Sequence, residues 1–169
     1  MKQRQIVLYN VLFPLWILML FPQTWLVVLP VNFIIDLLVL WLSLRYQAVP
    51  DRARILPRTI WKSWIAGFAA DLLGAVPMLL TLVLGSFSEW FSQHIFQPVM
   101  VNPFTDGVGF LWVAGCVALA GWAIYQLNLR WCLKNTPLTP DETKKTAMAM
   151  AVCTAPYVFF FPSSLLYGF

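Results

Sequence analysis

The chain is 169 residues long; 60% of its residues are hydrophobic and only 11% are charged. Soluble domains carry about 25% charged residues, so this chain has too few polar side chains to cover a surface that faces water. The same figures exclude intrinsic disorder, which requires low hydrophobicity and high charge. The composition therefore indicates an integral membrane protein, and we expect an all-α fold in which a helix bundle crosses the bilayer several times.

Five apolar segments are long enough to cross the hydrocarbon core, which takes about 20 residues of helix. In chain order they cover approximately residues 6–22, 25–44, 64–86, 108–129 and 143–166. Pro22, Gln23 and Thr24 separate the first two and predict a tight turn. No small-residue cleavage site follows the first segment, so we interpret it as a retained helix and not as a signal peptide. Residues 1–169 are thus predicted to form a single transmembrane domain.

The distribution of lysine and arginine predicts how these spans are oriented. All 11 basic residues fall in three segments: residues 2–4, 45–62 and 130–145. Because cytoplasmic loops collect Lys and Arg, we expect five spans with the N-terminus in the cytoplasm and the C-terminus outside. This pattern suits a multi-pass protein of the bacterial cytoplasmic membrane. It also accounts for the net charge of +4 without a nucleic-acid partner.

The second basic segment has a further interpretation besides orientation. Basic side chains near a membrane surface attract anionic lipid headgroups. The candidates for such contacts are Arg52, Arg54, Arg58 and Lys62.

The loop between the third and fourth spans, residues 87–107, is more than a plain connection. Its large apolar side chains recur at spacings of three to five residues: Phe87, Trp90, Phe91, Ile95 and Phe96. This spacing predicts a short amphipathic helix that lies in the outer interface with its aromatic side chains toward lipid. We expect Pro98 and Pro103 to end it. A lid over an outward-facing cavity is the alternative.

The start of the last helix carries a recognisable signal. Thr139 followed three residues later by Glu142 forms the pattern of a capping box, and Pro140 between them suits the first helical position. We therefore expect this helix to begin in the cytosol at Thr139, about two turns before it enters lipid.

Small residues at regular steps predict where helices approach closely, because lipid is as apolar as leucine and association depends on close contact. Three of the expected helices carry such stripes: Ala66, Ala70 and Gly74; Ala114, Ala118 and Gly121; Ala147, Ala151 and Ala155. The stripes fit packing within the chain, against a second copy, or against another membrane protein.

Two aspartates inside the spans are the strongest functional candidates. Asp36 lies nine residues before Arg45, and Asp71 lies nine residues after Lys62. At 1.5 Å per residue both carboxyls lie roughly 10–13 Å below the inner boundary, and Asn32 adds an amide one turn from Asp36. Charged groups at this depth are costly and face the bundle interior. Two carboxyls there cannot both ionise at low cost, which suits proton relay or cation coordination. The alternative is that each carboxyl hydrogen-bonds to another helix as part of the packing.

The other chemistry-bearing residues predict no site. His94 is the only histidine, and a metal site needs three or four ligands. The three cysteines have no CxxC spacing, and there is no phosphate-binding loop or HExxH motif. We therefore expect no catalytic residues, no metal and no cofactor.

Three function classes remain open, in this order of preference. The first is a small transporter or channel that works as an oligomer, with Asp36 and Asp71 handling protons or cations. The second is an accessory or assembly subunit that binds another membrane protein through the small-residue faces. The third is a membrane enzyme that modifies lipid.

Overall fold

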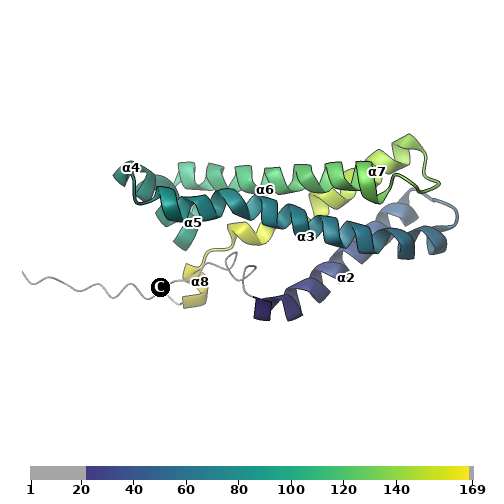
Figure 1. Ribbon diagram of the computed structural model, residues 1–169, viewed down its shortest axis with the longest axis horizontal. Coiled ribbons are helices and arrows are strands. Elements are labelled where there is room, and N and C mark those ends of the chain that lie inside the picture. The colour runs from purple at the N-terminus through teal and green to yellow at the C-terminus, as the bar shows by residue number, and fades with distance from the viewer. Residues whose placement is uncertain (1–21, 168–169) are drawn as a thin grey trace, which may run out of the picture.

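The computed structural model of the protein is shown in Figure 1, and it describes residues 22–167. Most of the first expected span, residues 6–22, therefore lies outside the described residues. Within them the regular elements are helices, and no strand occurs. Three helices are long and apolar enough to cross a membrane, over Trp25–Tyr46, Arg52–Leu84 and Gly107–Cys132.

Four helices close a ring in which each contacts two neighbours. They are α2 (Pro22–Tyr46), α3 (Arg52–Leu84), α6 (Gly107–Leu127) and α7 (Pro140–Cys153). Contacts join α2 to α3, α3 to α6, α6 to α7 and α7 back to α2. In Figure 1, α3 and α6 run side by side along the molecule, whereas α2 leaves α3 at an angle toward its own N-terminal end.

The interior consists of two apolar clusters. One lies toward the end where α2 joins α3 and contains Leu40, Leu44, Ile124 and Met150. The other lies toward the opposite end and contains Met78, Val99, Val113, Cys116 and Phe159. The side chains in these clusters are almost fully buried, while many large apolar side chains elsewhere on the helices face outward, as lipid-facing surfaces do.

The basic residues of the described part gather at one end of the bundle. That end holds the connection from α2 to α3 and the connection from α6 to α7 (Figure 1). The segment 45–62 is mostly helix: only Gln47–Asp51 lie outside α2 and α3. Arg52, Arg54 and Arg58 are exposed on the first turns of α3, and Lys62 is half-buried one turn further.

The predicted capping box at the start of α7 is confirmed. The Thr139 hydroxyl accepts a hydrogen bond from the Glu142 N–H at 3.3 Å, and the Glu142 carboxylate accepts one from the Thr139 N–H at 2.8 Å. Pro140 occupies the first turn, where its missing N–H has no partner to lose.

The expected helix over residues 143–166 is interrupted. α7 ends at Cys153, and the chain continues through Pro156 into the short 3-10 helix η4 (Tyr157–Phe160) and then α8 (Ser164–Tyr167). Proline explains the break, because Pro156 has no N–H for the carbonyl of Val152 and disfavours helical backbone at the residue before it. The hydroxyl of Tyr157 replaces the missing donor and binds the Val152 carbonyl at 2.6 Å.

The loop helix of residues 87–107 differs from the prediction in two respects. It runs through α4 (Glu89–Phe91), the π-helical turn η1 (Ser92–Phe96) and α5 (Gln97–Val101), followed by the 3-10 turn η2 (Pro103–Thr105). Pro98 therefore does not end it. This proline stands in the first turn of α5, directly after η1, where the lack of an N–H costs few backbone hydrogen bonds.

The aromatic face of this helix is also divided. Phe87 and Trp90 are exposed, as expected, but Ile95 is only 5% exposed and Phe91 lies edge-on against Trp112 of α6. The helix thus packs on the bundle through one side of its apolar face.

Candidate functional site

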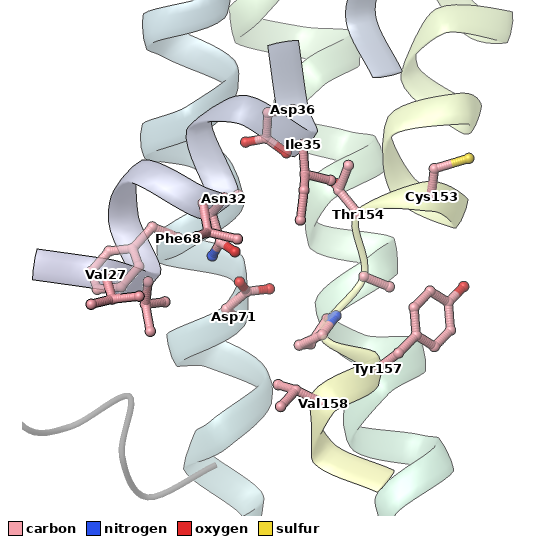
Figure 2. Close-up of a pocket in the computed structure, with 15 residues that line it drawn as sticks. Val27, Asn32, Ile35, Asp36, Phe68, Asp71, Cys153, Thr154, Tyr157 and Val158 are labelled. Atoms are coloured by element: carbon pink, nitrogen blue, oxygen red, sulfur yellow. The ribbon is translucent and has the colours of Figure 1, made fainter. Parts of the chain in front are cut away.

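The two aspartates open onto one cavity of about 580 Å³. Its walls come from the N-terminal half of α2, from the middle of α3, and from the interrupted chain after α7. Figure 2 shows Asp36 and Asp71 in the cavity wall with Asn32 between them, opposite Thr154 and Tyr157. Residues of α2 and α3 line the cavity, and Figure 1 shows that α2 diverges from α3 toward the N-terminal end of α2.

Asp36 is 4% exposed and contacts the broken end of α7. The hydroxyl of Thr154 lies within hydrogen-bonding reach of its carboxyl. That hydroxyl also donates its hydrogen to the Met150 carbonyl at 2.8 Å.

Asp71 is 6% exposed, and its Oδ1 has no hydrogen-bond partner among the described residues. It is close enough to Asp36 for the two carboxyls to interact electrostatically. A buried carboxyl oxygen without a partner is costly. Asp71 thus brings to the cavity wall a carboxyl with one oxygen that has no partner among the described residues.

Gly67 makes room for this pair. It lies one turn before Asp71 on α3, and a Cβ added to it would lie 3.4 Å from Oδ2 of Asp36. Any longer side chain here would extend toward the Asp36 carboxyl.

The remaining lining is largely apolar. Besides Asn32, Thr154 and the two aspartates, the walls consist mainly of aliphatic and aromatic side chains: Val27, Val28, Val31, Ile35, Phe68, Ala155, Pro156, Tyr157 and Val158. The exposed thiol of Cys153 also borders the cavity. No Lys, Arg or His is among these lining residues, so the carboxyls have no basic partner within the described wall.

The small residues on α3 lie at the contact with α6. Ala66, Ala70 and Gly74 are buried. A Cβ on Gly74 would lie 2.8 Å from the Cβ of Ala120 and 2.9 Å from the carbonyl oxygen of Cys116, so only glycine allows this approach.

The small residues on α6 and α7 are placed less uniformly. Ala118 is exposed and Ala114 half-buried, and Ala120 meets α3 in their place. Gly121 faces α7, where a Cβ would lie 3.5 Å from the Ala151 carbonyl oxygen and 3.9 Å from Ala155 Cβ. On α7, Ala147 and Ala151 are buried. Of the three small residues expected on α6, only Gly121 thus lies at a close helix contact.

A buried polar pair crosses the α3–α6 contact. The Ser63 hydroxyl donates to Oδ1 of Asn128 at 2.7 Å, and Nδ2 of Asn128 donates to the Ile124 carbonyl at 2.9 Å. Asn128 is fully buried and begins the π-helical turn η3 (Asn128–Cys132) that extends α6. The Ser63 hydroxyl and both ends of the Asn128 amide have hydrogen-bond partners, so this polar pair fits a structural role.

A second polar contact lies at the opposite end of the bundle from the basic residues. Nδ1 of His94 lies 2.8 Å from Oδ2 of Asp106, and Oδ1 of Asp106 accepts the backbone N–H groups of Val108 and Gly109 at the start of α6. The hydrogen bond to His94 is the main cause that holds the pKa of Asp106 below its ordinary value. This contact was not predicted from the sequence, although an Asp directly before an apolar helix is a capping signal.

Metal binding has little support in this part of the chain. Residues 22–167 contain no cluster of three or more His, Cys, Asp or Glu side chains that could hold a metal ion. Cys116 and Cys132 are buried free thiols, and Cys153 is an exposed one.

Comparisons with protein-family models, curated proteins and solved structures found no match for the chain. The fold and the cavity therefore carry the functional argument by themselves. They describe a helical chain with three helices able to span a membrane and an apolar cavity that holds a buried pair of carboxyls.

Proposed function

We propose that the protein is a small membrane transporter or channel in which Asp36 and Asp71 bind and release protons or cations. The observation that carries this proposal is the shared cavity of about 580 Å³ with both carboxyls in its wall. Carboxyls buried in membrane helices are costly, and they mark ion pathways and proton relays. Helices interrupted at membrane depth are tolerated where they line a cavity, and the break after Cys153 does so here.

The surrounding topology belongs to the same proposal. Five spans, with the N-terminus inside a bacterial cytoplasmic membrane and the C-terminus outside, place the basic residues toward anionic lipid headgroups. A chain of this size forms a solute pathway as a homo-oligomer or with another membrane protein. The exposed small-residue face of α6 at Ala118 is available for that contact.

Ion flux on carboxyl variants tests the mechanism. Asp36→Asn and Asp71→Asn keep size and hydrogen bonding but remove the titration, so the protein should fold. Potential-driven proton flux, followed with a pH dye inside reconstituted vesicles, should fall toward the background of empty vesicles. If the pair works as one unit, the double variant should be little worse than either single variant.

Two further variants separate transport from packing. Asp51→Asn removes an exposed carboxyl at the basic end and should leave flux unchanged. Leu at position 36 or 71 should lower stability if the carboxyls only hold helices together. Intact flux in the double Asn variant would remove the aspartates from the mechanism and favour an accessory subunit.

Cysteine labelling tests the topology. In a variant without the native cysteines, a cysteine at Gln93 should react with an impermeant thiol reagent in intact cells, whereas one at Ala53 should not. Both positions are exposed and lie at opposite ends of the bundle. The reverse pattern would contradict the N-inside orientation.

A further inference from the structure

We propose that the ligand of this cavity is a hydrophobic organic monocation, such as a quaternary ammonium with an aromatic or alkyl body. The positive group would lie against Asp36 and Asp71, and the body against the apolar walls contributed by α2 and by the chain after α7. This inference rests on the proposed function and names its substrate class.

The size and the lining of the cavity favour an organic ligand over a hydrated ion. Pockets for small molecules occupy about 300–1,000 Å³, and the volume of about 580 Å³ lies within that range. A hydrated inorganic ion would place its water shell against valine, isoleucine and phenylalanine side chains. The polar side chains of the wall are two carboxyls, one amide and two hydroxyls (Figure 2), and the other lining residues are largely apolar.

The electrostatics of the cavity favour a positive charge. Its titratable groups come from four elements: Asp36 on α2, Asp71 on α3, Cys153 at the end of α7, and Tyr157 on η4. None of these groups is cationic. Oδ1 of Asp71 has no hydrogen-bond partner among the described residues, and the charge of a nearby cation would stabilise this carboxyl in its ionised form.

The C-terminal end of α7 adds to the negative potential in the cavity. α7 ends at Cys153, and Cys153 and Thr154 line the cavity. The C-terminal end of a helix carries a partial negative charge of about half an elementary charge. Two carboxyls and one helix terminus therefore act on the same volume with the same sign.

Aromatic side chains complete the match. Phe68 on α3 and Tyr157 on η4 both line the cavity, and aromatic faces attract quaternary ammonium groups. Figure 2 places their rings on opposite sides of the two carboxyls. An inorganic cation would interact only with the polar groups, whereas an aromatic ammonium would interact with the carboxyls through its charge and with the apolar and aromatic walls through its body.

The test compares a cation with its neutral isostere. Benzyltrimethylammonium and neopentylbenzene have the same shape and differ in charge at one atom. Equilibrium binding to the detergent-solubilised full chain should detect the cation and give much weaker binding of the neutral compound. Equal binding of both compounds, or no binding of the cation, overturns the inference.

Variants locate the site. Asp36→Asn and Asp71→Asn should each weaken cation binding by roughly tenfold or more, as expected when a buried charge loses its partner, and Asp51→Asn should not. Gly67→Leu should abolish binding with both carboxyls present, because its side chain grows from a Cβ position 3.4 Å from Oδ2 of Asp36. Gly115→Leu is its control, since a Cβ there meets nothing within 4 Å. Unchanged affinity in both Asn variants and in Gly67→Leu overturns the inference.

The two proposals fail separately. Cation binding that depends on the aspartates, without flux of any ion, keeps the ligand class and rejects transport. Proton flux that depends on the aspartates, without binding of the organic cation, keeps transport and rejects the ligand class.

Discussion

Gly74 and Gly67 lie two turns apart on α3 but have opposite surroundings. At Gly74, an added Cβ would meet the Ala120 side chain and the Cys116 backbone of α6 at under 3 Å. At Gly67, it would meet only the Asp36 carboxyl, at 3.4 Å. Gly74 lets the backbones of α3 and α6 approach each other, whereas Gly67 forms part of the cavity wall. One helix thus contributes both the rigid contact of the bundle and the wall of its cavity.

Buried polar groups also differ between the α3–α6 contact and the cavity wall. Ser63 and Asn128, at the α3–α6 contact, satisfy each other and the Ile124 carbonyl. Asp71, on the cavity wall, keeps an oxygen without a partner among the described residues. Paired polar groups hold membrane helices together, whereas an ionisable group inside a membrane segment is a functional candidate. The comparison therefore separates a polar contact with a structural role from the carboxyl on which the proposed function rests.

The largest expected effect comes from Gly74→Leu, which breaks the rigid side of the comparison. Its Cβ cannot fit beside Ala120 and the Cys116 carbonyl, so α3 and α6 must separate. We expect a loss of about 3 kcal/mol or more in the free energy of unfolding, at the upper end of overpacking effects. Thermal unfolding in detergent measures it. Gly115→Leu adds the same side chain to an open position on α6 and should be nearly silent; equal losses at both sites would mean that α3 and α6 do not pack as described.

Gly67→Ala tests the other side of the comparison. Its effect on the free energy of unfolding should be smaller than that of Gly74→Leu and of opposite sign. The added methyl group makes only ordinary contact with Asp36, and alanine favours helix over glycine by up to about 1 kcal/mol. We expect unchanged or slightly raised thermal stability together with a narrower cavity. Gly74→Ala is the matched control and should destabilise. A clear loss of stability in Gly67→Ala would indicate that the cavity is closed around this position.

The smallest effect concerns the contact between His94 and Asp106, where the loop helix meets the start of α6. Because the pKa of Asp106 is lowered in the folded protein, its contribution to stability is present above the ordinary aspartate pKa of about 3.9. It is lost as the pH falls through the lowered value. Asp106→Asn keeps a capping oxygen but removes the titration.

The corresponding measurement is the melting temperature of wild type and Asp106→Asn between about pH 7 and pH 3. The difference should hold from neutral pH down to the ordinary aspartate pKa of about 3.9 and shrink below it. A difference that grows toward low pH would contradict this assignment.

Part of this architecture could be predicted from the sequence. The apolar character and the helical class follow from composition, and the start of α7 follows from the Thr139–Glu142 capping box. Equal spacing from the basic residues predicted one membrane depth for Asp36 and Asp71, which stays a prediction, and both residues line a single cavity.

The misses share a physical cause. Small residues occur on several faces of α6, so their spacing alone did not distinguish exposed Ala118 from Ala120, which meets α3. The contact of Thr154 with Asp36 joins residues far apart in the chain and depends on where α7 breaks. Pro156 explains why α7 breaks, but only the tertiary arrangement shows that the break borders the cavity.

The connection between α2 and α3 has a consequence for protein engineering. Ala48 and Asp51 hold left-handed backbone angles, with φ of 52° and 57°, and this conformation costs an L-residue roughly 1–2 kcal/mol. The chain thus stores strain at the basic end of the bundle, remote from the cavity. Glycine at position 48 would release part of it without altering a cavity wall. This short connection is accordingly the first place to seek a more stable protein for experimental work.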